Sequence, residues 1–294
     1  MPLDKLYAVV QPKADPSAQK HQEKIMQFRY IDMDRIIRQQ DAMRDRFRSA
    51  EPFELLVIDD FLTPAGLEAL EVEKLLKIPS SKEFSSDYMF AKNKIENPKL
   101  ATISQGLSQL REELLSDQFR DFLSHIYGQE IFLDPKFAGG GLHQGGSGSF
   151  LEMHADFSRH PNQREWIREL NLLLYLNRDW DESWGGQLDL KNKNTGALTS
   201  VEPIENRMVI MLSKGHTVHG YKPITFPEGM LRTSIAAYAY SMDDGTQHVP
   251  YRSTEWQPSD TGKRLFATFW NRIVPIKQRL FGSRTAKRAE DGEG

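Results

Sequence analysis

Short apolar runs separated by Gly, Asn, Asp and Pro fill the chain from Ile131 to Ser241, and this pattern constrains the fold more than any other feature. The nine runs are IFLDP, KFAGGGLHQ, SGSFLEMHA, ELNLLLYLN, GGQLDLKN, GALTSVEP, NRMVIMLS, HTVHGYKP and LRTSIAAYAYS. Apolar runs of this length with turn residues between them are typical of β-strands joined by short loops. We therefore predict an all-β barrel or sandwich over this part of the chain.

Helical patterns lie on both sides of the β region. Apolar residues at a spacing near 3.6 predict an amphipathic helix over about residues 19–50 and one or two helices over residues 101–127. The segment after Tyr251 again has a helical pattern, with Leu265 and Phe266 among its apolar residues. The predicted fold class is therefore mainly β with flanking helices.

The segment between the first two helical regions has its own signals. ELLVIDD, residues 54–60, predicts a short strand, and Thr63-Pro64 predicts the start of a helix to about Lys77, because threonine caps helices and proline suits their first turn.

Residues 79–98 are rich in Ser, Asn and Lys and predict a long surface loop with Phe84, Tyr88 and Phe90 exposed. This loop could serve as a lid over a site or as a plain connector, and the sequence does not decide between the two.

Composition argues against several classes of function. Thirty-eight Lys and Arg against 41 Asp and Glu leave a net charge of −3, which supplies no chain-wide attraction to nucleic acid or acidic lipid. No apolar run approaches the ~18 residues that a membrane-spanning helix needs. The absence of cysteine excludes disulfides and thiolate ligands, so any metal must be held by His, Asp or Glu. We expect an uncleaved, cytoplasmic protein that binds neither nucleic acid nor membrane, and its oligomeric state stays open.

The motif His154-Ala155-Asp156 is the strongest chemical signal in the chain. On a strand, residues two apart lie on the same face, so this His and this carboxylate can converge on one ion. A third ligand is available after the run NRMVIMLS, which leads into His216 and His219. Two histidines and one carboxylate are the facial triad of Fe(II) oxygenases, although a lone HxD is common by chance.

The ordered elements around this motif resemble the prolyl 4-hydroxylase-like branch of the iron(II)/2-oxoglutarate-dependent dioxygenase superfamily. They are HAD, RELNLLLYLNRDWDESWGGQLDL, VEPIENRMVIMLSKGHTVHG and LRTSIAAYAYS, and the similarity covers roughly residues 54–245. The resemblance implies a double-stranded β-helix, a jelly-roll barrel of two sheets. It also implies three parts: an N-terminal arm and amphipathic helix (1–50), the dioxygenase domain (51–245), and a C-terminal helical extension and tail (246–294).

The resemblance assigns roles to six residues. It implies that His154, Asp156 and His219 are the iron ligands, with His216 as the rival of His219. His219 is preferred because a short turn and Pro223 follow it, as they follow the ligand in this branch.

For the cosubstrate, the resemblance implies that Arg232 holds the distal carboxylate of 2-oxoglutarate, that Tyr175 donates to the same carboxylate, and that His143 faces the cofactor or substrate. Catalytic residues beyond the metal centre are not expected.

The activity implied by the resemblance is hydroxylation of an unactivated C–H bond with Fe(II), 2-oxoglutarate and O₂, releasing succinate and CO₂, with ascorbate as an additional candidate. Asp156 stands where halogenating relatives have a small residue, which favours hydroxylation. The substrate is a small molecule (amino acid, glycan or natural product) or a prolyl residue of a peptide, and Arg159 or Arg164 is a candidate for contacting an anionic group on it. A zinc hydrolase and a non-catalytic, cupin-like small-molecule-binding barrel are the alternatives.

Overall fold

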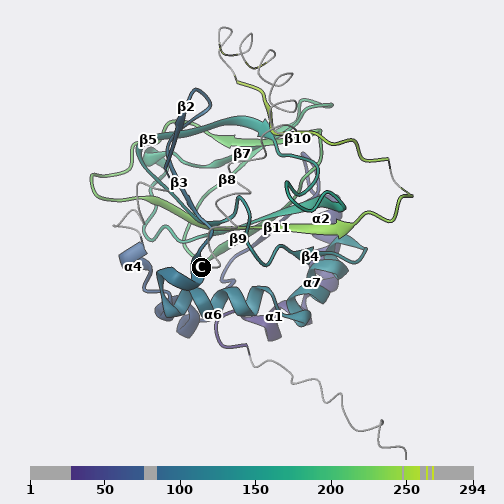
Figure 1. Cartoon of the computed structure of the whole chain (residues 1–294). Coiled ribbons are helices and arrows are strands. Elements are labelled where there is room, and N and C mark those ends of the chain that lie inside the picture. Colours follow the sequence, from purple (N-terminus) through teal and green to yellow (C-terminus); the bar gives the residue numbers. More distant parts are fainter. Residues whose placement is uncertain (1–27, 76–84, 247, 259–262, 264–266, 268–294) are drawn as a thin grey trace, which may run out of the picture.

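The computed structural model describes residues 28–75, 85–246, 248–258, 263 and 267. Two layers of strands lie above a layer of helices that covers one face of the nearer strands (Figure 1). The helices are α1 (Met33–Arg38), α2 (Gln40–Ser49), α3 (Pro64–Ala69), α4 (Val72–Leu75), α5 (Leu100–Ile103), α6 (Gln105–Leu114), α7 (Asp117–Tyr127) and the 3-10 helix η3 (Glu182–Trp184). The strands are β1 (Leu55–Ile58), β2 (Ser85–Tyr88), β3 (Ala91–Asn97), β4 (Phe132–Leu133), β5 (Gly141–Ala155), β6 (Trp166–Tyr175), β7 (Leu188–Asn192), β8 (Leu198–Val201), β9 (Arg207–Leu212), β10 (Thr217–Tyr221), β11 (Arg232–Met242) and β12 (Glu255–Trp256).

The strands form one curled sheet in the order β1-β9-β6-β11-β5-β10-β7-β8. Every pair of these strands is antiparallel. Strand β5 belongs to both layers, because residues 141–145 pair with β11 whereas Leu151 and His154 pair with β10. A long strand shared by two facing layers is the geometry of a jelly-roll barrel, so the predicted fold class is confirmed.

One detail of the predicted strand count is wrong. The runs KFAGGGLHQ and SGSFLEMHA were expected as two strands, but they form the single strand β5 of 15 residues. Its glycine-rich middle looks like a turn in the sequence alone. In the fold, β11 and β3 lie on opposite edges of β5 and supply hydrogen-bond partners there, so the backbone stays extended.

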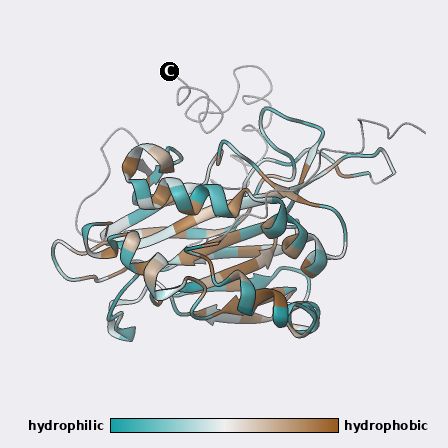
Figure 2. Cartoon of the chain, turned by 90° about the horizontal axis from the view of Figure 1, so that it is seen from below, coloured by the Kyte–Doolittle hydropathy of each residue, from teal (hydrophilic) through white to brown (hydrophobic). Residues whose placement is uncertain are grey.

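Helices α6 and α7 form the centre of the helical layer, and they begin where their capping residues predict. The side chains of Ser104 and Ser116 accept hydrogen bonds from the backbone N–H groups of Leu107 and Phe119. Their apolar faces pack on the sheet in one continuous core, and Figure 2 shows them lying over largely hydrophobic strands. The predicted helices over 101–127, the strand in 54–60 and the cap at Thr63 are confirmed.

The predicted helix over 19–50 is shorter in the fold. Helix α1 begins at Met33, because the Asp32 side chain caps it by accepting from the backbone N–H of Arg35. A break at Gln39 separates α1 from α2. Residues 28–32 are not helical, and the part of the prediction over 19–27 lies outside the described residues.

The Glu113 carboxylate explains why residues 29–31 are not helical. It is fully buried on α6 and accepts hydrogen bonds from the backbone N–H groups of Arg29, Tyr30 and Ile31 at 2.8–3.2 Å. Three donors on one buried carboxylate fix the start of the described chain against the helical layer.

We expect Glu113→Ala to lower the free energy of unfolding by roughly 3 kcal/mol, because three backbone donors lose a charged acceptor inside the protein. Urea denaturation measures this loss, with Glu112→Ala as the matched control, since Glu112 is exposed on the same helix. A loss equal to that of the control would mean that water replaces the carboxylate without cost.

The predicted surface loop over 79–98 is wrong for its second half. Residues 85–97 form the hairpin β2–β3, and β3 pairs with β5. Phe90, expected to be exposed, is 1% exposed and stacks on Trp256 with 4.9 Å between ring centroids. Polar composition predicted a loop because it cannot reveal that β5 offers a long edge to pair with. Phe84 and the side chain of Tyr88 lie outside the described residues.

The segment after Tyr251 differs from its helical prediction over residues 251–258, whereas the described residues 263 and 267 are helical as predicted. Glu255 and Trp256 form β12 and pair with Ala155 and His154 of β5. Leu265, Phe266 and most of the predicted C-terminal helix lie outside the described residues.

Candidate metal centre

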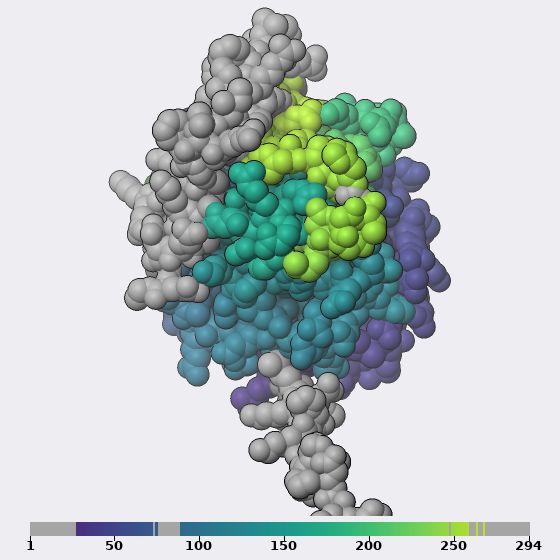
Figure 3. Space-filling view, turned by 45° about the vertical axis from the view of Figure 1, so that its right-hand side comes forward, coloured from purple at the N-terminus to yellow at the C-terminus, as the bar shows by residue number. Residues whose placement is uncertain are grey.

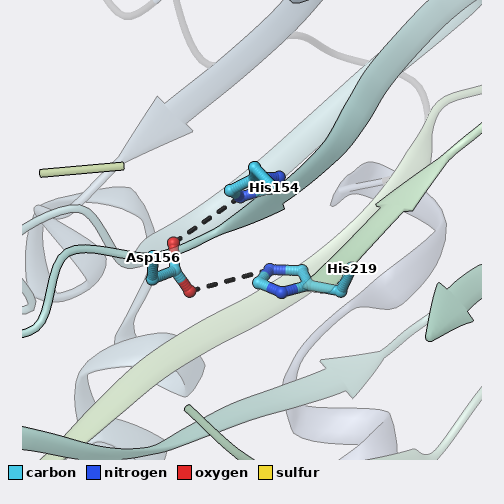
Figure 4. A group of neighbouring side chains, drawn as sticks. All are labelled: His154, Asp156 and His219. Atoms are coloured by element: carbon cyan, nitrogen blue, oxygen red, sulfur yellow. Dashed lines mark ion pairs between the residues drawn. The ribbon is translucent and has the colours of Figure 1, made fainter. Parts of the chain in front are cut away.

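His154, Asp156 and His219 converge at the end of β5, as Figure 4 shows. His219 on β10 lies directly across from His154 on β5 in the antiparallel register, and their ring centroids are 4.4 Å apart. Asp156 follows β5 immediately, and its two carboxylate oxygens lie 3.5 Å from Nε2 of His154 and 3.7 Å from Nε2 of His219. One potential ligand atom from each residue thus lies within 4.8 Å of the other two.

The two imidazoles are held so that a nitrogen of each faces Asp156. Nδ1 of His154 lies 2.9 Å from the Glu152 carbonyl, and donation there leaves the lone pair on Nε2. Burial, followed by the nearby His154, lowers the pKa of His219 to about 3. His219 is therefore neutral at physiological pH, which is the form that binds a metal.

Two buried residues on β6 keep Asp156 ionised and oriented. Asn171 donates to one carboxylate oxygen at 2.6 Å, and Nη1 of Arg168 lies 3.4 Å from the other. Burial alone raises the pKa of Asp156, but Arg168 first and then His219 and His154 outweigh it and hold this pKa well below its usual range. The guanidinium of Arg168 lies between the rings of Phe157 and Tyr238, 4.2 and 3.4 Å from their centroids.

Arg168 and Asn171 were not recognised in the sequence. They are three residues apart, so regular alternation puts them on opposite faces of a strand. A bulge at Glu169 changes this, because Arg168 pairs with Tyr240 and Asn171 pairs with Tyr238. The bulge therefore turns both side chains to the same face, toward Asp156.

This donor set fits a divalent transition metal. Two neutral imidazole nitrogens and one carboxylate, buried and aimed at a common point, are the ligands of the Fe(II) facial triad. Within the described parts of the chain, no other group of three His, Asp or Glu side chains converges in this way. His216, the rival of His219, lies in the turn before β10 and is not part of the group.

A cavity of about 160 Å³ adjoins the three residues, and Arg232 and Tyr175 line it with them. The Arg232 guanidinium donates to the Gly186 carbonyl at 2.8 Å and to the Tyr175 hydroxyl at 3.2 Å, and it lies 4.3 Å from the centroid of the Tyr221 ring. Among the described residues, no carboxylate forms an ion pair with Arg232. A buried, unbalanced cation of this kind favours an anionic ligand.

His143 also lines the cavity, but on a different element from the one expected. It was predicted on the strand before the HxD motif, whereas it lies on β5 itself, the same strand as His154. Its Nε2 lies 3.2 Å from the Gly139 carbonyl. Burial, followed by the charge of Lys94, lowers the pKa of His143 to about 4, so the ring is neutral.

Further lining residues come from segments whose structure the sequence did not reveal. Lys94 and Glu96 come from β3, and Thr254 and Trp256 come from the segment at β12. The Trp256 ring lies 4.9 Å from the ring of His154 and covers that side of the site. Both segments were expected as loop or helix, so their side chains could not be assigned to a site.

The loop after β5 lies against the segment that follows β11, as Figure 3 shows in teal and light green. Arg159 pairs with Asp243 at 2.6 Å and donates to the Val249 carbonyl. Arg164 lies 5.1 Å from the centroid of the Tyr251 ring. The side chains of Arg159 and Arg164 thus contact other residues of the protein itself, and neither side chain lines the cavity.

Comparison with known proteins agrees with this geometry. Residues 140–240 match the family model described as the 2OG-Fe(II) oxygenase superfamily. A prolyl 4-hydroxylase from Phytophthora capsici is similar in structure, with 17% identity, a TM-score of 0.53, and coverage of 92% of this chain and 85% of that one.

Two other solved structures are more distant. A Trichoplax adhaerens prolyl hydroxylase in complex with a hypoxia inducible factor peptide has 16% identity and a TM-score of 0.48, covering 72% of this chain and 93% of that one. HygX from Streptomyces hygroscopicus, with nickel, 2-oxoglutarate and hygromycin B bound, has 14% identity and a TM-score of 0.45, covering 70% and 88%. Among curated proteins, none matches the chain.

The fold and the family match define the class of protein: residues 140–240 form a 2OG-Fe(II) oxygenase domain with the fold of a prolyl 4-hydroxylase. Residues 140–240 therefore have the family match of a 2-oxoglutarate-dependent dioxygenase domain, a class that uses Fe(II) with 2-oxoglutarate and O₂ as cosubstrates. This agrees with the resemblance found in the sequence and decides against a non-catalytic, cupin-like barrel. No helix in the described residues is long and apolar enough to cross a bilayer.

Proposed function

We propose that this enzyme hydroxylates an unactivated C–H bond, of a small molecule or of a prolyl residue, and releases succinate and CO₂. The observation that carries the proposal is the buried Arg232, which lacks a carboxylate partner in the described residues and lines the same cavity as His154, Asp156 and His219. A metal site beside an unbalanced guanidinium suits a cosubstrate that has one end on the metal and a carboxylate at the other.

In this proposal His154, Asp156 and His219 hold Fe(II), and Arg232 with Tyr175 holds the distal carboxylate of 2-oxoglutarate. Bound Fe(II) supplies the activation of O₂ that oxidative decarboxylation of 2-oxoglutarate requires. The planar fork of Arg232 suits a bidentate carboxylate, and the Tyr175 hydroxyl is within hydrogen-bond distance of that fork. His143, neutral and buried, faces the cosubstrate or the substrate.

The protein's own part is orientation and exclusion of water. Arg168 and Asn171 hold the Asp156 carboxylate in one position, and Trp256 covers His154. Asp156 fills the position that a halide would need, which supports hydroxylation over halogenation.

Three further parts of the prediction are retained as proposals. The dioxygenase domain spans 51–245, between an N-terminal arm with its helix (1–50) and a C-terminal extension (246–294). A cytoplasmic location is supported by the complete absence of cysteine. Ascorbate as an additional reductant stays a prediction.

Arg232→Ala is expected to weaken 2-oxoglutarate binding about tenfold to a hundredfold, because charge-assisted hydrogen bonds to a buried carboxylate are lost. Arg232→Lys, which keeps the charge but not the fork, should give an intermediate loss. Calorimetry under nitrogen with Fe(II)-loaded protein measures the affinity, and the iron content of each variant is the control. Unchanged affinity in the alanine variant would show that Arg232 is not the cosubstrate anchor.

A further inference from the structure

The cavity contains a second cation, Lys94 of β3, whose role differs from that of Arg232. In the sheet register, Lys94 of β3 pairs with Gly145 on one edge of β5, and Arg232 of β11 pairs with Gly145 on the other edge. Residues in one such row project to the same face, and the strands are about 4.8 Å apart. Two cations therefore flank a glycine that has no side chain to separate them. A Cβ at Gly145 would meet Oγ of Ser149 at 2.4 Å, so the Ser149 side chain occupies the space over this position and only glycine fits there.

Lys94 is already paired, whereas Arg232 is not. Nζ of Lys94 lies 2.6 Å from a carboxylate oxygen of Glu96, and the two side chains are only 14% and 25% exposed. Burial lowers the pKa of Lys94, but Glu96, Tyr238 and Tyr221 together outweigh burial and raise this pKa above its ordinary value. Lys94 is therefore charged, and the pair with Glu96 has no net charge.

Two residues further along β3, on the same face of the sheet, Glu96 lies beside the neutral His143, which pairs in turn with Ser234 of β11. Both charged groups of the pair line the cavity that reaches the three candidate metal ligands. A ligand in this cavity thus meets an ammonium and a carboxylate side by side, in addition to the metal ligands and Arg232.

The net charge of the pair restricts what can bind to it. A ligand with only a carboxylate could bind Lys94, but Glu96 would then be a partly buried carboxylate that has lost its ion pair with Lys94. Leaving a buried charge without this pair costs free energy. A ligand with both a carboxylate and an ammonium can exchange with the pair, carboxylate to Lys94 and ammonium to Glu96, and every charge keeps a partner. A prolyl residue inside a peptide carries neither charge.

The walls of the cavity favour a small ligand over a polypeptide. The Trp256 ring lies 4.9 Å from the His154 ring at a tilt of 31°. Phe157 and Thr254 line the same cavity, and Arg252 donates to the Asp156 carbonyl at 3.0 Å. A segment of the chain itself therefore lies beside the candidate metal ligands on the side of β12.

We propose that Lys94 and Glu96 recognise the substrate, and that the substrate is a small zwitterion of the α-amino-acid class. This inference rests on the proposed function, since it concerns the substrate of the same centre. Lys94 binds the substrate carboxylate and Glu96 binds its ammonium group, while Arg232 remains with 2-oxoglutarate.

The test uses the full chain and four variants: Lys94→Met, Glu96→Gln, the double variant, and Lys92→Met as control. Lys92 is an exposed lysine on the same strand and does not line the cavity. The twenty free L-amino acids are screened for stimulated succinate release with Fe(II) and 2-oxoglutarate. Each active one is then compared with its N-acetyl and carboxamide derivatives, and its binding to the protein with Fe(II) and 2-oxoglutarate is measured by calorimetry under nitrogen.

We expect at least one amino acid to bind and stimulate, and both derivatives to lose the effect. Lys94→Met and Glu96→Gln should each weaken amino-acid binding about tenfold to a hundredfold, with Lys92→Met unchanged. The double variant removes both charges of the pair, so neither is left buried without its partner. It therefore reports on binding even if one of the single variants folds poorly. The affinity for 2-oxoglutarate should stay at the parent value in all four.

Two results would overturn the inference while leaving the proposed function intact. One is stimulation by proline-containing peptides or neutral compounds with no response to any amino acid. The other is a loss of 2-oxoglutarate affinity in Lys94→Met equal to that in Arg232→Ala, which would assign Lys94 to the cosubstrate. If the parent protein binds no 2-oxoglutarate at all, the proposed function itself fails and the inference falls with it.

Discussion

Asp156→Ala is expected to abolish succinate formation and to weaken Fe(II) binding, because the variant loses the only anionic group of the proposed ligand set. Two neutral imidazoles remain, and they cannot balance the charge of a divalent ion. Succinate release and iron content after anaerobic loading measure the two effects. Turnover of 2-oxoglutarate at the parent rate would contradict the assignment of all three ligands.

The same substitution should also destabilise the fold, for a separate reason. Arg168 is fully buried, and Asp156, 3.4 Å away, is its carboxylate partner. Removing one member of a buried ion pair costs about 3–5 kcal/mol, because the other charge is left uncompensated. The double variant Asp156→Ala with Arg168→Met should recover much of this stability in urea denaturation while remaining inactive. Recovery of activity in the double variant would show that the loss arose from misfolding and not from a missing ligand.

His219→Ala is expected to be as severe as Asp156→Ala in activity, whereas His216→Ala should retain close to the parent rate. His219 lies across from His154 on the neighbouring strand, within 3.7 Å of the Asp156 carboxylate. His216 lies in the preceding turn, where its backbone carbonyl accepts from the N–H of Lys193. This backbone contact survives the substitution.

The matched pair of histidine variants is compared by succinate release and by iron content, with thermal unfolding as the check on folding. The opposite ranking, with His216→Ala inactive and His219→Ala active, would transfer the ligand role to His216. Equal and mild effects would instead argue that the third ligand is not a histidine of this segment.

Local sequence patterns predicted much of the fold because they act over a few residues. Capping at Thr63, the apolar faces in 101–127 and the run LLVI at 55–58 each depend on neighbours within one or two turns. The HxD motif belongs to this group, since its two side chains share a face by strand alternation alone. The meeting of His219 with His154 could be expected only through the family resemblance.

Other parts of the site depend on partners far away in the chain, and here prediction from sequence failed. Lys94 and Glu96 were read as part of a polar loop, because nothing near them shows that β5 presents an edge for β3. Trp256 was placed in a helical region for the same reason. Arg168 and Asn171 turn to one face only because of the bulge against β11.

The sequence by itself determined the strand-rich class, the helices that cover it, and the pair of ligand types two residues apart. The tertiary structure decided which strands lie beside β5, and hence which charges enter the cavity with His154 and Asp156. The physical reason is that a strand's hydrogen bonds are made with other strands, so its pairing and register depend on residues far away in sequence, whereas a helix satisfies its own backbone locally.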